Sequence, residues 1–365
     1  MSKLEQIQTW ADSQKADLVY VSDPKTIQYL TGFYSDPIER VLALLVFPDQ
    51  DPFMFAPALE VEAIKDTGFK YPVYGYLDHE NPWEKIGAQV NKRNANVKSI
   101  ALEKTQLSVE RLEALKTTFT SATFDLNISP FFEKMRLIKT PDEIEKLNIA
   151  GKWADFAFEQ GFVAVKAGRS EQQVAADLEY ALKQKGIMEM SFDTLVQAGA
   201  HAAEPHGATN GTKFENNELI LFDLGTVWEG YISDASRTVA LGKPTEKQLD
   251  IYNVCLEAQL TAQDYAKPGI TAASLDKVAR DVITKAGYGE YFIHRLGHGM
   301  GMSEHEYPSI MEGNDLLLEP GMCFSIEPGI YIPGVAGVRI EDCVHITETG
   351  NEPFTHTSKD LTYVG

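Results

Sequence analysis

The stretch that decides the fold runs from Glu218 to Val239, ELILFDLGTVWEGYISDASRTV, and holds two aspartates, Asp223 and Asp234, 11 residues apart. Four consecutive apolar residues precede Asp223, as in a strand that is buried on both faces. The turn-forming segment 226–230 separates this strand from a second strand that carries Asp234. The pattern predicts a hairpin that takes two carboxylates into an apolar interior, where each needs a counter-charge.

A second acidic hairpin follows about a hundred residues later. CFSIEPG contains Glu327 and GVRIEDCV contains Glu341, 14 residues further on. Between the two hairpins lies HRLGHGMG, whose glycines let His298 approach closely. Each of these residues alone has a simpler explanation, an edge charge or a hydrogen-bonded core histidine. Four such carboxylates and one imidazole, with no lysine beside them, together predict a pair of divalent cations.

This set of side chains predicts hydrolytic chemistry. Oxygen-rich ligation with one imidazole suits two divalent metal ions, which we expect to be manganese, with cobalt or zinc as alternatives. Two adjacent ions can share a bridging water, lower its pKa and polarise a carbonyl group, so the expected nucleophile is a hydroxide. The sequence has neither the GxSxG motif nor the HExxH motif, and Ser309 stands where the second histidine of HExxH would fall.

Length and charge agree with a cytoplasmic enzyme. The chain has 365 residues, enough for two domains, and a formal net charge of −20. Nucleic acid and anionic membranes are therefore not expected as partners, because both require a basic patch. We recognise no signal peptide and no apolar run of membrane-spanning length. The three cysteines lack CxxC spacing, which indicates neither a disulfide framework nor a thiolate zinc site.

Residues 1–128 alternate between helical and strand patterns, and we expect them to form an α/β domain with a mixed or parallel sheet. No phosphate-binding loop or cluster of acids and histidines occurs there, so we place the chemistry elsewhere. A charged, turn-rich loop, residues 32–40, is either a solvated connector or a loop that reaches a neighbouring subunit's active site. The predicted helices are 4–14, 24–30, 58–66, 82–90 and 108–117, and the predicted strands are 17–21, 41–47, 71–76 and 97–102.

Residues 129–365 form the second predicted domain. Thr140 and Glu143, with Pro141 between them, make a capping box that begins a helix running to about residue 163. From there the chain repeats: VKAGRSEQQVAADLEYALKQKG matches AKPGITAASLDKVARDVITKAG in register. Each copy follows a long helix and precedes an acidic hairpin. The repeat predicts two αβ halves related by a pseudo-twofold axis, a curved sheet and a cleft between the halves.

Several of these motifs together resemble a known family. FDLGTVWEGYISDASRTV, HRLGHGMGMSEHEYP, CFSIEPGIYIP and GVRIEDCV are similar to the motifs of the pita-bread metallopeptidases. The resemblance covers residue 131 to the C-terminus, and residues 1–128 resemble the creatinase-like domain of some members. It implies an α/β (α+β) fold: a creatinase-like N-terminal domain, followed by a catalytic pita-bread domain whose sheet is curved and mainly antiparallel.

The resemblance also assigns roles to particular residues. It implies that Asp223, Asp234, His298, Glu327 and Glu341 bind the two metals and that Glu327 is also a proton shuttle. His206, His294 and His305 match the family's substrate-site histidines, and Arg339 matches the arginine two residues before the last ligand. We expect His206 and His305 to face each other across the cleft and to act in catalysis, by binding substrate or stabilising the tetrahedral intermediate. All five ligands are present, which disfavours the alternative of a non-catalytic binding protein with this fold.

Within the family two activities compete. Prolidases cleave Xaa-Pro dipeptides, whereas aminopeptidases P release the first residue of longer Xaa-Pro peptides. The compact length favours an Xaa-Pro dipeptide as the substrate, whose proline carboxylate needs a cation, best supplied by an arginine. HEYP is followed by Ser309, where prolidases often have that arginine. We expect Arg295 to replace it, or Arg40 of the partner subunit, reaching over from the loop 32–40 of a homodimer.

Overall fold

The computed structural model describes residues 1–205 and 207–365, and it divides into two compact units. The first unit is Met1–Met135 and the second is Arg136–Gly365. They meet within helix α6 (Ser129–Leu137), the helix that follows the domain boundary expected at residue 128. None of the helices in the described part of the chain is long and apolar enough to cross a membrane.

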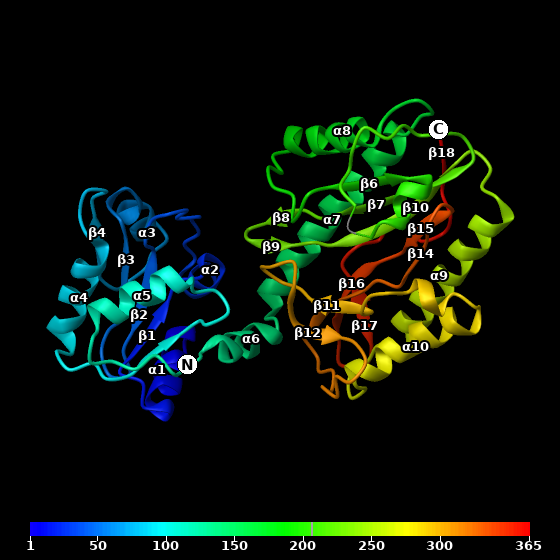
Figure 1. The fold of residues 1–365 in the computed structure, drawn as a ribbon. Coiled ribbons are helices and arrows are strands. Elements are labelled where there is room, and N and C mark those ends of the chain that lie inside the picture. Colours follow the sequence, from blue (N-terminus) through cyan, green and yellow to red (C-terminus); the bar gives the residue numbers. More distant parts are fainter. Residues whose placement is uncertain (206) are drawn as a thin grey trace. The chain divides into compact units, whose positions relative to one another are not determined.

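The first unit is an α/β domain built on one mixed five-stranded sheet, as expected (Figure 1). Its strand order is β4-β3-β2-β1-β5, with parallel pairing in β1–β5 and β3–β4 and antiparallel pairing in β1–β2 and β2–β3. Apolar side chains from alternate strand positions form separate cores on the two faces of this sheet. The strands are β1 (Leu18–Val21), β2 (Ala43–Val46), β3 (Phe53–Pro57), β4 (Val73–Tyr76) and β5 (Ile100–Leu102).

The helices of this unit lie close to their predicted positions. Their bounds are α1 (Lys3–Gln14), α2 (Pro24–Thr31), η1 (Ala58–Glu60), α3 (Val61–Asp66), α4 (Pro82–Arg93) and α5 (Val109–Thr118). Strand β3 was not predicted from the sequence. Its segment FMFAP is completely buried and apolar, so it has no alternation to mark it as a strand.

The second unit repeats one arrangement twice. In the first half, the long helix α7 and helix α8 are followed by a sheet with the order β18-β10-β7-β6, to which the C-terminal residues Tyr363–Val364 contribute the edge strand β18. In the second half, α9 and α10 are followed by strands with the order β12-β11-β13-β16-β17. Strands β10, β7 and β6 thus correspond to β16, β13 and β11. Each half has its own apolar core between its helices and its sheet (Figure 1), and the predicted fold class is confirmed.

The capping box that was predicted at the start of this unit is present: Thr140 accepts from the Glu143 N–H, and Glu143 accepts from the Thr140 N–H. The helices are α7 (Pro141–Ala164), α8 (Glu171–Gln184), η2 (Gly199–Ala203), α9 (Glu246–Tyr265), α10 (Ala272–Lys285) and η3 (Gly289–Tyr291). The strands are β6 (Leu195–Ala198), β7 (Glu218–Leu224), β8 (Val227–Trp228), β9 (Tyr231–Ile232), β10 (Ala235–Leu241), β11 (Gly297–Gly299), β12 (Glu306–Ile310), β13 (Cys323–Ile326), β14 (Gly329–Ile332), β15 (Ala336–Arg339), β16 (Asp342–Ile346), β17 (Asn351–Pro353) and β18 (Tyr363–Val364).

Both acidic hairpins are longer than a pair of strands joined by a turn. A small two-stranded ribbon separates the two main strands of each: β8–β9 lies between β7 and β10, and β14–β15 lies between β13 and β16. Hydrogen bonds divide the strands of the expected curved sheet into two main sheets. These are joined where the Glu341 N–H donates to the Ser236 carbonyl, at 3.1 Å. The two hairpins therefore meet at the strands that carry their acids.

Candidate metal centre

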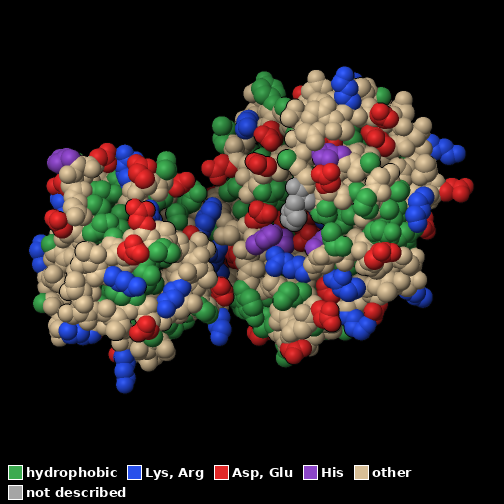
Figure 2. Space-filling model, in the orientation of Figure 1, with side chains coloured by type: hydrophobic (Ala, Val, Ile, Leu, Met, Phe, Trp, Pro, Cys, Tyr) green, Lys and Arg blue, Asp and Glu red, His purple; other side chains and the backbone are tan. Residues whose placement is uncertain are grey.

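The predicted site residues gather in one cavity of the second unit. Its volume is about 780 Å³, and Figure 2 shows histidine, basic and acidic side chains gathered on one face of this unit. The cavity brings together nine of the eleven residues that the sequence singled out: Asp223, Asp234, His294, Arg295, His298, His305, Glu327, Arg339 and Glu341. Of the other two, His206 lies outside the described residues, and Arg40 belongs to the first unit.

Equivalent strand ends deliver the four carboxylates. Asp223 is the last residue but one of β7, and Glu327 directly follows β13. Asp234 and Glu341 directly precede β10 and β16, so Asp234 lies just before the strand on which it was expected. The two halves therefore each contribute one acid at the end of the first strand and one at the start of the second. The repeat in the sequence is the reason for this arrangement.

His298 lies among these carboxylates on the short strand β11. Its Nε2 atom is 3.2 Å from Glu327 Oε1 and 3.5 Å from Asp234 Oδ2. The Ser325 hydroxyl accepts from the His298 N–H at 3.0 Å and donates to Glu327 at 2.9 Å. Glycine is needed on both sides of His298, because a Cβ atom on Gly297 would lie 1.9 Å from a backbone oxygen and one on Gly299 2.3 Å.

A second set of contacts orients Asp223 and Glu341. The Arg339 guanidinium forms an ion pair with Asp223 and donates to the Ser236 hydroxyl at 2.8 Å. That hydroxyl donates in turn to Glu341 Oε2 at 2.7 Å. Arg339 also donates to the Tyr331 hydroxyl at 2.9 Å. One buried cation thus connects carboxylates from both halves, and it does so as part of the cavity wall.

Burial dominates the electrostatics of the site. It raises the pKa of Asp234 well above the ordinary value, with the Asp223 charge adding to the effect, and it raises the pKa of Glu341 in the same way, helped by Asp234. Burial lowers the pKa of His298, but the hydrogen bond and charge of Glu327 outweigh it and raise that pKa to about 9. For Glu327 burial is likewise outweighed by His298, so its pKa is lowered.

The donor set fits divalent cations. Asp223 Oδ1 and Glu341 Oε1 are buried and have no hydrogen-bond partner among the described residues. Ligand atoms of Asp234, His298 and Glu341 lie within 4.8 Å of one another. Four carboxylates face one guanidinium, so three negative charges remain if the imidazole is neutral. Such an excess is too large for a buried site to hold as bare charge, and two divalent ions bound there would offset it.

The remaining histidines have different surroundings. His294 is part-buried, and burial lowers its pKa. Its Nδ1 atom lies 2.8 Å from the Arg295 carbonyl, so Nδ1 carries the proton, and the Tyr331 hydroxyl lies 3.1 Å from Nε2. His305 is more exposed, and its ring centroid is 4.1 Å from that of His298. Since residue 206 is not described, the expected opposition of His206 and His305 stays a prediction.

The two candidate anchoring arginines are in different units. Arg295 donates to the Ser309 hydroxyl at 3.0 Å, and a second nitrogen is 3.4 Å from His305 Nδ1. No carboxylate of the described residues lies within ion-pair distance of Arg295. Arg40, in the first unit, donates to both carboxylate oxygens of Asp78, at 2.9 and 3.2 Å.

Three supporting residues were not predicted: Ser236, Ser325 and Tyr331. A signal for the two serines exists in the sequence. Ser236 stands two positions after Asp234 and Ser325 two before Glu327, and period-2 alternation puts such residues on the same face of an extended chain. Arg339 stands two positions before Glu341 in the same way. No comparable signal marks Tyr331.

Both units match known protein families. Residues 145–348 match metallopeptidase family M24, and residues 3–138 match the creatinase/prolidase N-terminal domain. The family match on the second unit covers more than half of the chain and includes all nine predicted residues that line the cavity.

Similar proteins match over nearly their full lengths. An Xaa-Pro dipeptidase of Lactobacillus helveticus is 56% identical over 98% of this chain and 98% of its own. One of Lactobacillus delbrueckii subsp. lactis is 54% identical over the same shares. Among solved structures, a prolidase of Thermococcus sibiricus is 32% identical and superimposes with a TM-score of 0.93, covering 99% of this chain and 98% of that one.

Proposed function

Because this chain belongs to metallopeptidase family M24, we propose that it hydrolyses the Xaa-Pro bond of dipeptides with two divalent metal ions bound in the cavity. The observation that carries the proposal is the buried donor set, in which Asp223 and Glu341 each present an oxygen that has no partner in the described part of the chain. Nothing but a cation satisfies several buried carboxylates at once. The names of the relatives with more than half of their residues identical give the substrate class.

Each side chain then has a specific part. Asp223, Asp234, His298, Glu327 and Glu341 hold the ions, which when bound supply an activated water and polarise the scissile carbonyl group. Glu327 accepts a proton and passes it to the leaving nitrogen. The neutral His294, with the exposed His305 and with His206, binds the substrate.

Arg295 is the anchor that we propose for the proline carboxylate. Its side chain contacts a hydroxyl and an imidazole, so a carboxylate that enters the cavity meets a guanidinium that forms no ion pair among the described residues. Arg339 is a poorer candidate, because Asp223 already neutralises its charge. A guanidinium also binds a carboxylate through two parallel hydrogen bonds, which makes it selective for a dipeptide's free end.

A comparison of substrates tests the activity. After chelation the protein should be inactive, and Mn²⁺ or Co²⁺ should restore hydrolysis of Leu-Pro. Leu-Pro-Pro should be a much poorer substrate, and preferential release of leucine from it would replace the proposal with aminopeptidase P activity. Full activity in thoroughly metal-free protein would refute the metal mechanism.

A second comparison tests the anchor. Arg295→Met should raise KM for Leu-Pro but leave KM for Leu-Pro amide unchanged, because the amide has no carboxylate to lose. Arg295→Lys should recover part of the difference. An equal change in KM for both substrates would show that Arg295 does not bind the proline carboxylate. Arg40 would then become the candidate anchor.

Three finer points belong to the same proposal. We propose manganese as the native metal, since oxygen-rich ligation suits it, and metal analysis of the purified protein tests this.

We propose a cytoplasmic homodimer in which Arg40 of the partner subunit helps to restrict the substrate to dipeptides. Arg40→Ala should raise KM for Leu-Pro with metal content unchanged, and light scattering should give the mass of two chains. Unchanged kinetics would make the loop 32–40 a solvated connector.

A further inference from the structure

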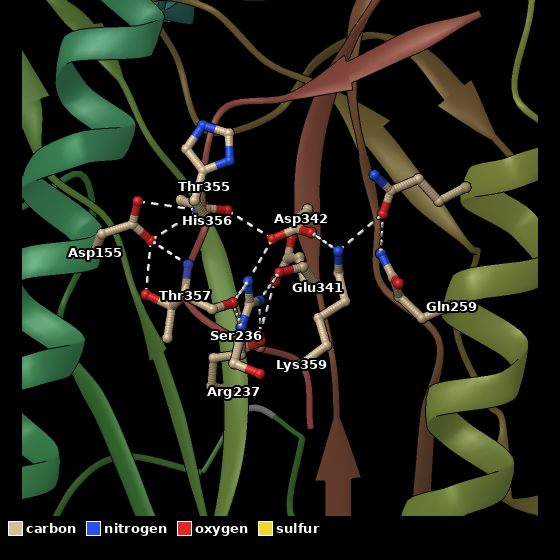
Figure 3. Close-up of polar contacts among 12 residues, drawn as sticks. Asp155, Ser236, Arg237, Gln259, Glu341, Asp342, Thr355, His356, Thr357 and Lys359 are labelled. Atoms are coloured by element: carbon tan, nitrogen blue, oxygen red, sulfur yellow. Dashed lines mark hydrogen bonds and ion pairs between the residues drawn. The ribbon is translucent and has the colours of Figure 1, made fainter. Parts of the chain in front are cut away.

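The face of the sheet that points away from the metal cavity carries a buried polar network (Figure 3). At its centre is Arg237, on β10, whose side chain is opposite to that of Ser236 because successive residues of a strand alternate. Its ion-pair partner is Asp342, the residue after Glu341 on β16. Arg237 is 2% exposed and Asp342 is not exposed at all. The proposed hydrolysis assigns no role to either residue.

All five N–H donors of Arg237 are used. One terminal nitrogen donates to the backbone carbonyls of Ser236, at 3.0 Å, and Glu341, at 2.5 Å. The other donates to Asp342, at 2.7 Å, and the Thr357 carbonyl, at 2.7 Å, and Nε donates to the same carbonyl at 2.9 Å. A lysine has one nitrogen and three donors, so it could not span these acceptors.

The hydrogen bonds from Arg237 to the Ser236 and Glu341 carbonyls are the ones that connect the network to the metal site. Ser236 holds the Glu341 carboxylate through its hydroxyl, and its carbonyl accepts from the Glu341 N–H. Arg237 therefore ties together, from behind, the two strands whose front faces carry the metal site. These strands come from different halves of the domain, so their separation sets the distance between ligands of the first half, such as Asp234, and Glu341.

The C-terminal segment 355–359 completes the network. Asp342 accepts from the Thr355 hydroxyl at 2.6 Å and forms an ion pair with Lys359. Asp155, on α7, accepts from the backbone N–H groups of 356 and 357, at 2.9 and 2.7 Å. The Tyr252 hydroxyl, on α9, donates to the Lys359 carbonyl at 2.5 Å. Helices from both halves thus fix the segment against the two strands.

We propose that Arg237 and Asp342, held by the C-terminal segment 355–359, form a positioning clamp that sets the spacing of the metal ligands. The clamp rests on the proposed metal centre and adds to it residues that touch neither metal nor substrate. Metal–ligand distances tolerate only about 0.2 Å, so a small shift of β10 against β16 weakens binding. Loss of a group that orients a ligand typically costs 10–100-fold in metal affinity or activity.

The test uses chelated full-length protein titrated with Co²⁺, which reports coordination through its visible absorption. The wild type must bind Co²⁺ and hydrolyse Leu-Pro; if it does not, the proposed function itself fails. Arg237→Met should weaken Co²⁺ binding about 10–100-fold, change the absorption bands and lower kcat. KM for Leu-Pro should stay within about twofold, since Arg237 lies behind the cavity. Arg237→Lys should not restore Co²⁺ affinity, because it lacks the forked donors.

Tyr252→Phe is the matched control. It removes a part-buried hydrogen bond to the same C-terminal segment but leaves the hydrogen bonds from Arg237 to the Ser236 and Glu341 carbonyls in place. It should lower the melting temperature without changing Co²⁺ affinity or absorption. If Arg237→Met is less stable but keeps the wild-type affinity, bands and kcat, the network is only structural and the clamp is refuted.

Arg237→Met leaves a buried carboxylate without its main partner, so it could fail to fold. Asp342→Asn is then the variant to use, because it keeps the shape and one acceptor while removing the charge that fixes the guanidinium. It should weaken Co²⁺ binding at least threefold in the folded protein. Wild-type affinity in that variant would overturn the clamp.

Discussion

Glu341 and Asp342 are neighbours in the chain and both are buried, but their surroundings are opposite. Asp342 points to the back of the sheet, where Arg237 and Lys359 neutralise it and Thr355 donates to it. Glu341 points into the cavity, where its polar partner is the Ser236 hydroxyl and one oxygen has no partner among the described residues.

The partners of these two side chains distinguish a structural carboxylate from a proposed metal ligand. Both are as buried as the apolar core, so burial alone does not separate them. The charge of Asp342 is offset by cations built into the fold, whereas Glu341 forms no ion pair among the described residues and has a raised pKa in the metal-free protein. The same backbone alternation that separates the two side chains lets one strand serve both purposes.

The largest effect is expected from replacing Glu341, the carboxylate that points into the cavity. Glu341→Gln should remove a metal and reduce hydrolysis of Leu-Pro at least a hundredfold, as measured by proline release and metal content. The metal-free variant should be more stable than the metal-free wild type, because a neutral amide no longer suffers repulsion from Asp234. Lower stability of the metal-free variant would mean that Glu341 is structural, like Asp342.

Replacing the other member, Asp342, should lower the stability of the metal-free protein instead of raising it. Asp342→Leu should destabilise the protein by about 3–5 kcal/mol, because the buried Arg237 and the partly buried Lys359 lose the carboxylate that offsets their charge. Denaturant unfolding of metal-free protein measures this, and Asp281→Leu, which breaks an exposed ion pair with Lys277, is the control. A loss as small as that of the control would show that the back of the sheet does not depend on its charge pairs.

A third buried carboxylate, Glu103 in the first unit, has neither a cation among the described residues nor a proposed metal as its partner. We expect it to have a smaller effect on stability than Glu341 or Asp342. Its carboxylate accepts from the N–H groups of Ser22 and Asp23, at 3.1 and 3.2 Å, and burial raises its pKa to about 7. The folded state therefore holds this proton more tightly than the unfolded state does. Stability from Glu103 is complete below its unfolded pKa of about 4.5 and is lost as the pH rises through about 7.

Glu103→Gln removes that proton and should make the stability of the first unit less dependent on pH between about 5 and 8. The midpoint of unfolding, followed in parallel for wild type and variant, measures the change. The difference should be the same with and without metal, since Glu103 is not at the cavity. If the two proteins follow the same pH curve, the backbone donors keep Glu103 charged in the folded state.

Much of this protein could be predicted from sequence because its key residues lie on regular strands. Asp223, Asp234, Glu327 and Glu341 stand next to apolar runs, and the repeat of about a hundred residues relates the two pairs. Local periodicity and the capping box at Thr140 predicted most of the helices and strands. The buried strand β3 was missed, because a continuous apolar run has no period to detect.

Only the tertiary structure decided which buried charge pairs with which. Arg339 and Asp223 are 116 residues apart, and Arg237 and Asp342 are 105 apart. Sequence spacing carries no information about such pairs, so it could not tell that Arg339 pairs with Asp223. Nor could it tell that, among the described residues, the polar partners of Arg295 are Ser309 and His305. The sequence determined where the carboxylates stand on their strands, since alternation is a local property. The fold determined which carboxylate pairs with cations of the chain, as Asp342 does, and which keeps an oxygen without a partner among the described residues, as Glu341 does, since that depends on distances between halves.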